Sequence, residues 1–288
     1  MSPDSELPST PIARMVAVNL TQFLSTLITA NHILDYNQIV DGLGHVSVRN
    51  PNNNATFFMT GDPPPALVQS LADLNEYYIS DGSAVTPSAD HAAQSPYSER
   101  FIHQGILKRY PSQISVVHSH DLKVIPFGIS EVPFKPTYHM AGFVGEEVPV
   151  FDIANYYLPN DTQNMLISST RFGDALADTF STLANNVTKN NTEPDYTLVL
   201  QRGHGFATVG TSIEESVYRA VYTAWNAETQ ASALEIQNAY GASAETLKYL
   251  TPREAADCVP MNQGSYTKAW PLWQAQVEAD PLYKNDLI

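Results

Sequence analysis

Apolar side chains recur along the chain with two different periods. Over residues 15–31 they return at three- and four-residue spacings, which predicts a helix with one buried face. The same spacing predicts helices over 95–110, 168–183 and 211–240, the last behind a Thr-Ser cap. The buried stripe expected for the helix over 168–183 consists of Leu176, Phe180 and Leu183.

Short runs of β-branched and aromatic residues predict strands between these helices. Residues 40–49 contain two glycines followed by alternating apolar positions, and residues 55–59 form a second apolar run behind an asparagine-rich loop. The two runs together predict a hairpin. Further strands are predicted over 114–117, 147–151 and 196–200, where β-branched residues are concentrated.

No linker divides the chain convincingly, and 288 residues with 43% hydrophobic side chains suffice for one large domain. We expect this domain over residues 12–245, after a disordered, proline- and serine-rich tail over 1–11. A helical extension is expected over 246–288. The residues expected to break that extension into short helical pieces are Pro252, Pro260, Pro271 and Pro281.

The charge balance narrows the range of partners. The net charge is −15, from 30 acidic and 15 basic residues, which argues against nucleic acid and against an anionic membrane surface. No stretch approaches the ~18 apolar residues of a membrane-spanning helix, and no secretory signal is evident. A single cysteine, Cys258, allows no intrachain disulfide. We therefore expect a cytoplasmic protein.

Three histidines suggest a metal site. His118 and His120 follow the strand predicted over 114–117, and alternation along a strand places both on one face. His204 lies between two glycines after the strand predicted over 196–200, so it is the candidate for a third ligand. Three nitrogen ligands would leave one position open for water or substrate. An isolated His-x-His pair also occurs as two polar residues at a wet strand end, so the pair alone does not decide.

The order of several motifs resembles the class II aldolase/adducin family, which includes fuculose-phosphate and ribulose-phosphate enzymes. The resemblance covers about residues 15–240. The motifs that carry it are, in chain order, the glycine-rich segment 42–49, Ser98-Glu99 with His103, His118-Ser119-His120, and Gly203-His204-Gly205 ahead of a helix near Ser212.

This resemblance implies an α/β fold with three α/β/α layers and a central, mostly antiparallel sheet. It implies a divalent metal, usually zinc with manganese or cobalt as alternatives, held by His118, His120 and His204. It also implies a homotetramer with active sites near the subunit interfaces. Glu99 matches the family's acid/base carboxylate. A glutamate at a helix start can instead serve only the helix dipole, and the resemblance favours the catalytic interpretation.

The segments that bind phosphate in the sugar-phosphate enzymes are altered here. His45 replaces an asparagine in the Gly-Asn-x-Ser segment, and Tyr97 replaces the first residue of a Ser-Ser pair. The Thr-Gly turn is kept, but three prolines follow it closely. We therefore expect a non-phosphorylated small-molecule substrate. The residues expected to bind it are His45, Ser47, Thr60, Gly61, Tyr97 and Ser98.

These expectations favour a metal-dependent carbon–carbon lyase, of aldolase or decarboxylase type. It would act on a hydroxy-carbonyl or hydroxy-carboxylate compound through a metal-stabilised enolate. One alternative is an epimerase, dehydratase or isomerase with the same metal site, which only the shape of the pocket distinguishes. The other is a non-catalytic, adducin-like interaction module, against which the intact Glu99 and the three histidines argue. His103 is expected to pack or support, and His139 to be a plain loop histidine.

Overall fold

A computed structural model describes residues 18–85, 95–183 and 192–288 of the chain. The tail expected over 1–11 and the first residues of the helix expected from residue 15 lie outside the described residues. The C-terminal segment is described to its last residue.

A seven-stranded sheet in the order β3-β2-β1-β4-β7-β6-β5 forms the middle of the molecule. Every neighbouring pair is antiparallel except β5 and β6, so the expectation of a mostly antiparallel sheet is confirmed. The predicted hairpin is β1–β2, with Ser47 opposite Met59. The strands are β1 (His45–Arg49), β2 (Thr56–Thr60), β3 (Leu74–Tyr78), β4 (Ser115–Ser119), β5 (Val150–Phe151), β6 (Leu198–Gln201) and β7 (Gly205–Gly210).

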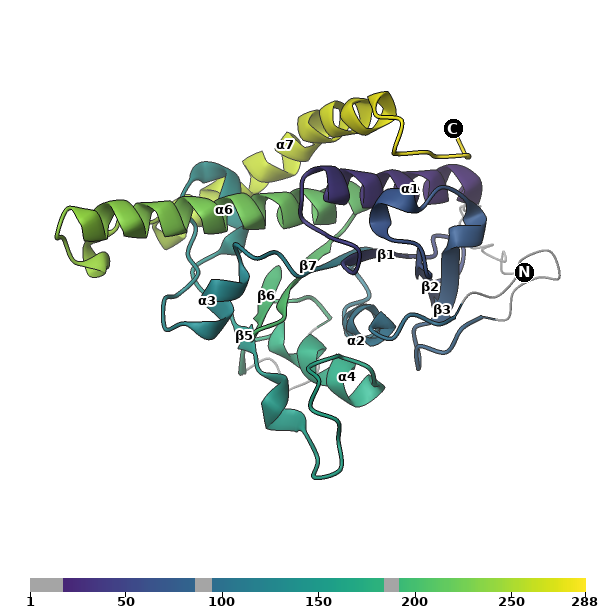
Figure 1. The fold of residues 1–288 in the computed structure, drawn as a ribbon, viewed down its shortest axis with the longest axis horizontal. Coiled ribbons are helices and arrows are strands. Elements are labelled where there is room, and N and C mark those ends of the chain that lie inside the picture. The colour runs from purple at the N-terminus through teal and green to yellow at the C-terminus, as the bar shows by residue number, and fades with distance from the viewer. Residues whose placement is uncertain (1–17, 86–94, 184–191) are drawn as a thin grey trace, which may run out of the picture.

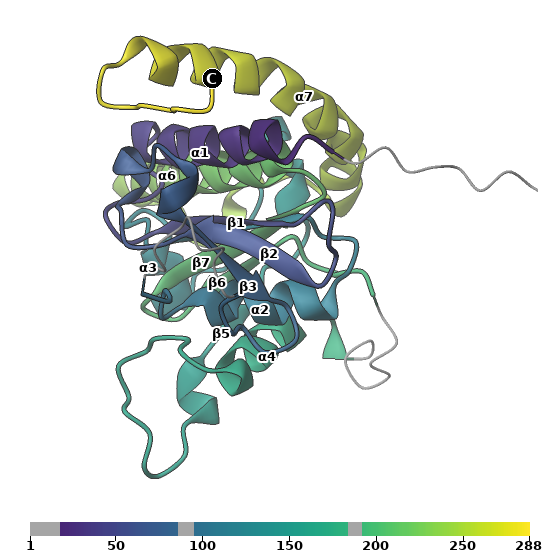
Figure 2. The ribbon, with the colours of Figure 1, turned by 90° about the vertical axis from the view of Figure 1, so that its right-hand side faces the viewer.

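Helices cover both faces of this sheet. The helices α1 and α6 lie on one face and α2 and α4 on the other, while α7 lies outside α1 and α6 (Figures 1 and 2). No helix within the described ranges is long and apolar enough to cross a membrane. The α-helices are α1 (Leu20–Tyr36), α2 (Arg100–Arg109), α3 (Ile125–Ile129), α4 (Thr170–Thr179), α6 (Ile213–Ala239) and α7 (Pro252–Ala279). The short 3-10 helices are η1 (Pro65–Leu67), η2 (Leu71–Asp73), η3 (His139–Val144), η4 (Ile153–Tyr156) and η5 (Ala244–Thr246).

The alternation of side chains along the strands divides the apolar residues between two cores. Val46 and Val117 belong to the core under α1 and α6. Met59, Val116 and Val209 belong to the core under α2 and α4. Residues at even spacing from Val116 on β4 therefore face α2, and His118 is one of them.

Two glycines let α2 and α4 touch backbone to backbone. A Cβ atom added at Gly105 would lie 2.2 Å from the carbonyl oxygen of Gly173. A Cβ atom added at Gly173 would lie 2.2 Å from the carbonyl oxygen of Phe101. Any side chain at either position would collide with main-chain atoms, so the two helices can cross this closely only with glycine at both. This close crossing brings the start of α2 near the segment that leads into α4.

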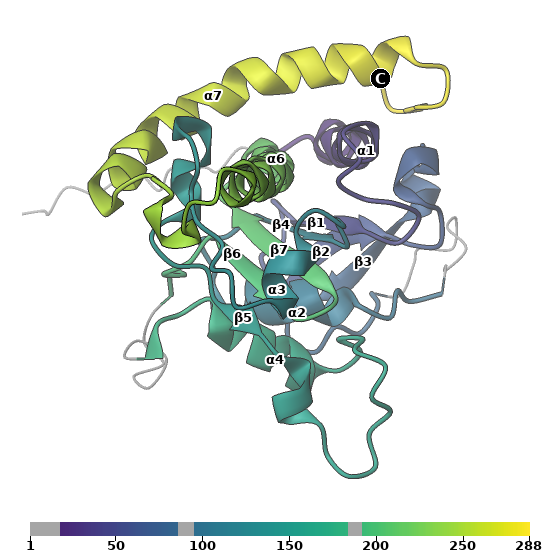
Figure 3. The same ribbon diagram turned by 60° about the vertical axis from the view of Figure 1, so that its left-hand side comes forward.

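The C-terminal segment differs from the prediction. Pro260 and Pro271 lie inside one 28-residue helix, α7, so the expectation of short pieces broken at each proline is wrong. A proline removes one amide hydrogen bond and presses on the preceding turn, which bends a helix without ending it when packing holds both sides. The arc of α7 over α6 and α1 is visible in Figure 3. Its buried anchors are Ala255, Asn262, Trp270, Trp273 and Val277.

A second expectation also fails. Leu183, predicted to be buried, is 85% exposed, whereas Leu176 and Phe180 are fully buried. The reason is that α4 ends at Thr179 and Phe180 is its C-cap, so the helical spacing no longer applies at residue 183.

Candidate metal centre

The three histidines come from two neighbouring strands. His118 is the penultimate residue of β4 and is fully buried, and His120 follows the end of that strand. His204 lies in the turn between β6 and β7. The next residue, Gly205, has a φ of +135°, and a Cβ atom there would lie 1.9 Å from the carbonyl oxygen of Ser119. Only glycine lets the turn approach β4 this closely, which brings the His204 ring within 4.9 Å of the His120 ring.

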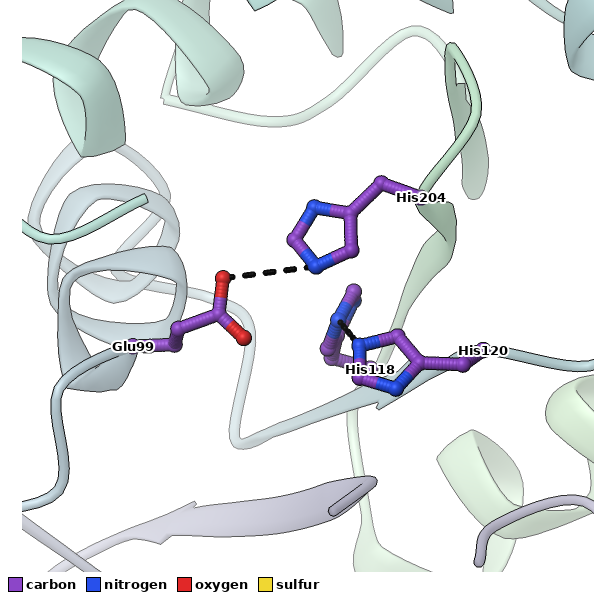
Figure 4. A group of neighbouring side chains, drawn as sticks. All are labelled: Glu99, His118, His120 and His204. Atoms are coloured by element: carbon purple, nitrogen blue, oxygen red, sulfur yellow. Dashed lines mark hydrogen bonds and ion pairs between the residues drawn. The ribbon is translucent and has the colours of Figure 1, made fainter. Parts of the chain in front are cut away.

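Glu99 completes a compact group with these histidines. One ligand atom from each of Glu99, His118, His120 and His204 lies within 4.8 Å of the other three. The Nε2 atoms of His118 and His120 are 3.0 Å apart, and Glu99 Oε1 lies 3.4 Å from His204 Nε2. Figure 4 shows the four side chains converging from three directions. The structure thus brings together the three predicted ligands and the predicted acid/base residue.

The contacts of His118 suit a metal ligand. Its Nδ1 atom lies 3.0 Å from the carbonyl oxygen of Phe206, which can only accept, so the ring proton belongs on Nδ1. The amide nitrogen of Gln201 lies 3.2 Å from the same nitrogen, while its Oε1 atom is buried without a partner among the described residues. A half-turn of this amide lets Oε1 accept from Nδ1 as well. Either way the Nε2 lone pair of His118 is left for a cation.

Burial keeps these imidazoles in the form that binds metals. Desolvation, followed by repulsion from His204, holds the pKa of His118 well below its usual value. The same two causes lower the pKa of His120, opposed by the attraction of the Glu99 carboxylate. Both rings are therefore neutral at pH 7, and their Nε2 atoms lie 3.0 Å apart. Neutral nitrogens beside one carboxylate are a donor set that fits zinc.

Glu99 does not cap its helix. It occupies the N-cap position of α2, yet its side chain makes no capping hydrogen bond. The carboxylate instead turns inward, is 3% exposed, and its Oε1 atom accepts a hydrogen bond of 3.1 Å from the backbone N–H of Ile167. The alternative of a purely dipole-serving glutamate does not describe this geometry, because the carboxylate points away from the first turn of α2.

The residues expected to bind substrate separate into two sets. His45 packs against the metal centre, with its ring 5.0 Å from that of His118, and Tyr97 packs edge-on against His45 at 4.8 Å. The Tyr97 hydroxyl donates to the carbonyl oxygen of Leu43 at 2.6 Å, and burial raises the pKa of Tyr97 to about 12. Ser47 lies behind His45 on β1 and is fully buried.

The second set consists of Thr60, Gly61 and Ser98. Thr60 is buried at the end of β2, and the Gly61 N–H donates to the carbonyl oxygen of Asp73. Ser98 is exposed beside the start of α2. Their assignment to substrate binding stays a prediction.

The sequence interpretation missed two partners of the site. The Ile167 amide that holds Glu99 and the Gln201 amide beside His118 had not been singled out. A backbone N–H leaves no trace in a sequence. Gln201 did carry a signal, because it is the polar residue that directly follows the predicted strand over 196–200 and precedes His204.

Comparisons with known proteins agree with the motifs. Residues 25–231 match the family described as Class II Aldolase and Adducin N-terminal domain. The chain is 40% identical over 263 residues to the decarboxylase tropJ of Talaromyces stipitatus, covering 90% of this chain and 96% of that protein. It is 24% identical over 258 residues to a 3,4-dihydroxyphthalate decarboxylase of Arthrobacter keyseri, covering 87% and 92%.

Solved structures share the fold at low identity. The L-fuculose 1-phosphate aldolase from Glaciozyma antarctica superposes with a TM-score of 0.68 at 16% identity, covering 96% of this chain and 97% of the aldolase. An aldolase II superfamily protein from Pseudomonas syringae gives the same TM-score and identity over 94% and 98%. At this identity the likeness extends to the fold alone.

Proposed function

The chain belongs to the class II aldolase and adducin family, and on this premise we propose that it is a metal-dependent decarboxylase of a non-phosphorylated, hydroxylated aromatic carboxylate. The observation that carries the proposal is the group formed by Glu99, His118, His120 and His204. Two relatives named as decarboxylases support carbon dioxide release over aldol cleavage.

The three histidines would hold the cation, for which zinc fits the nitrogen-rich donor set and manganese or cobalt are alternatives. When bound, such a cation supplies a Lewis acid that polarises a substrate oxygen. The protein contributes orientation. The Phe206 carbonyl fixes the His118 ring, and the glycine-flanked turn fixes His204 against His120.

Glu99 would move the proton that decarboxylation requires. Its Oε1 atom is held by Ile167, whereas its Oε2 atom has no hydrogen-bond partner in the described part of the chain. As the carbon–carboxylate bond breaks, its electron pair stays on the ring carbon, and carbon dioxide leaves. Glu99 accepts the proton of the substrate hydroxyl and returns it to that carbon. Solvent then reprotonates the hydroxyl oxygen, so atoms and charge balance.

The surroundings of the site support a substrate without phosphate. A phosphate dianion needs a cation or several converging donors. Arg49 is buried, and its guanidinium donates to the carbonyl oxygens of Asn54, Leu107, Tyr110 and Gln113. Arg100 donates to the carbonyl oxygens of Gly82 and Tyr97. Both arginines near the altered phosphate segments are therefore already occupied by the backbone.

The proposal is tested by measuring carbon dioxide release from a panel of hydroxylated benzoates and phthalates, with and without a chelator. We expect release from at least one compound with a hydroxyl beside the carboxylate, its loss with chelator, and its recovery with zinc, manganese or cobalt. Aldol cleavage of a hydroxy-ketone with no release from any aromatic acid would contradict it.

We also propose a homotetramer, as the family resemblance implies. Exposed apolar side chains at the end of α6 support burial against another chain, since Ile236 is 72% and Tyr240 90% exposed. Light scattering after gel filtration should give four chain masses. A monomeric mass at micromolar concentration would contradict the assembly without touching the metal chemistry.

A further inference from the structure

A row of three buried polar side chains runs from the sheet interior to the metal centre. Ser47 Oγ lies 2.6 Å from His103 Nδ1, and His103 Nε2 lies 2.6 Å from His45 Nδ1. Ser47 and His103 are 0% and His45 is 1% exposed. We call this set, Ser47, His103 and His45, the histidine row.

The protons of the histidine row have one preferred direction. Among the described residues, the Ser47 hydroxyl has one hydrogen-bond partner, His103 Nδ1. If the hydroxyl donates there, His103 carries its proton on Nε2 and donates it to His45 Nδ1. The proton of His45 is then on Nε2. The reverse direction would bury the Ser47 hydroxyl proton without an acceptor, so it is disfavoured, whereas His45 Nε2 lacks a partner among the described residues in either direction.

The row ends in an unsatisfied group. His45 Nε2 is buried and has no partner among the described residues. Its ring lies 5.0 Å from the His118 ring, because His45 on β1 is paired directly with His118 on β4. Its ligand atoms are not part of the close group made by Glu99 and the three metal-centre histidines. A buried donor beside a metal centre, outside the ligand set, calls for an acceptor that arrives with the substrate.

We propose that His45 Nε2–H donates to a carboxylate oxygen of the substrate, and that His103 and Ser47 are positioning residues that fix this tautomer. The inference rests on the proposed function and deepens it. The substrate then presents two adjacent oxygen groups, a hydroxyl to the metal centre and a carboxylate to His45. A neutral donor with a fixed proton suits an anion, since the resulting hydrogen bond is charge-assisted.

The neighbours of His45 fix its ring, so that it would bind an oxygen in one defined place. Tyr97 covers its edge at 4.8 Å and is itself tied to Leu43, so the ring cannot turn toward solvent. A tetrahedral phosphate requires several donors around it, whereas a planar carboxylate can be bound by one donor at one oxygen.

Two amide substitutions separate the two nitrogens of His45. In His45→Gln the side-chain amide N–H reaches the position of Nε2, and in His45→Asn it reaches only that of Nδ1. Calorimetry on zinc-loaded protein measures Kd for salicylate and for phenol, which lacks the carboxylate. We expect His45→Asn to weaken salicylate about 10-fold or more and His45→Gln less than about threefold, with phenol and zinc content unchanged in both. Equal salicylate affinity in wild type and His45→Asn, or loss of zinc in either variant, would overturn the proposal.

The tautomer is measured directly on the unmodified protein. Long-range proton–nitrogen spectra of protein labelled in histidine nitrogen should show His45 and His103 protonated on Nε2, and Ser47→Ala should remove that preference. Protonation of His45 on Nδ1 in wild type would overturn the proposal even if every variant misfolded. Carboxylate-selective binding that depends on His45, in a protein that releases no carbon dioxide, would support this inference and count against the proposed decarboxylation.

Discussion

The two halves of the site are built in opposite ways. The metal-centre group takes its side chains from the end of β4, the turn between β6 and β7 and the N-cap of α2, and the His204 side chain keeps 12% exposure. In the histidine row, Ser47 and His103 come from the interior of β1 and α2 and are fully buried, while His45 is the first residue of β1. The first half is left for an incoming cation to complete, whereas the second is completed by folding except for its last nitrogen. Ligand-binding groups therefore occur near the ends of strands and helices, and tautomer-fixing groups in the interior of these elements.

The largest effect is expected when a metal-centre histidine is removed, because the metal-centre group depends on its cation and the histidine row does not. We expect His204→Ala to lose its metal, from about one ion per chain, and turnover to fall by about 10³-fold or more, because the Lewis acid goes with it. Elemental analysis after gel filtration measures the first effect. His139→Ala is the matched control, since His139 is an exposed histidine on η3. Full metal content in His204→Ala would remove the basis of the metal centre.

Glu99→Gln tests the carboxylate while leaving the histidines intact. The amide keeps the shape and the bond from Ile167 but cannot exchange a proton, so we expect turnover to fall by about 10²-fold with metal content unchanged. Glu228→Gln, at an exposed ion pair with Lys123, serves as the control. Near-normal turnover in Glu99→Gln would assign the proton transfer to another group.

The buried half should be visible as acid sensitivity. Burial lowers the pKa of His103 to about 3, below the ~6.5 of an unfolded chain. Between these values the unfolded state binds a proton that the native state refuses, so the free energy of unfolding falls as pH falls below 6.5. Between pH 7.5 and pH 5 the free energy of unfolding of the wild type should fall by about 2 kcal/mol more than that of His103→Gln, measured by urea unfolding. Parallel pH profiles for the two proteins would show that His103 does not titrate this way.

The smallest effect expected concerns phosphate. Because both nearby arginines are bound to carbonyl oxygens, phosphoglycolate should inhibit no more than about threefold better than glycolate at moderate salt. Glycolate is the control because both compounds chelate metals. A 100-fold advantage, about 2.7 kcal/mol, would restore a phosphate subsite and reverse the proposed substrate class.

Local pattern was a good guide wherever chemistry and backbone period coincide. The metal centre was predictable from the spacing of His118 and His120 and from the glycines around His204. The start of α6 was predictable from the Ser212 cap. The strand β7 was not predicted, because it follows His204 directly and its sequence resembles the end of a loop.

Other features depend on contacts that no local period encodes. The continuity of α7 through two prolines depends on its packing against distant elements. The link between His103 and His45 joins residues 58 positions apart. His45 and Ser47 could be placed on one strand face from the sequence, but the partner that connects them lies on a helix.

The contact between Gly105 and Gly173 has a consequence for natural variation. Glu99 lies six residues before Gly105, and Ile167 lies six residues before Gly173. The distance between α2 and α4 at their crossing therefore controls the hydrogen bond from the Ile167 N–H to Glu99. One added methyl group would wedge the helices apart and pull the carboxylate from its amide. A population variant with alanine at either glycine would pass for a mild change in a helix, yet it would behave as an active-site lesion.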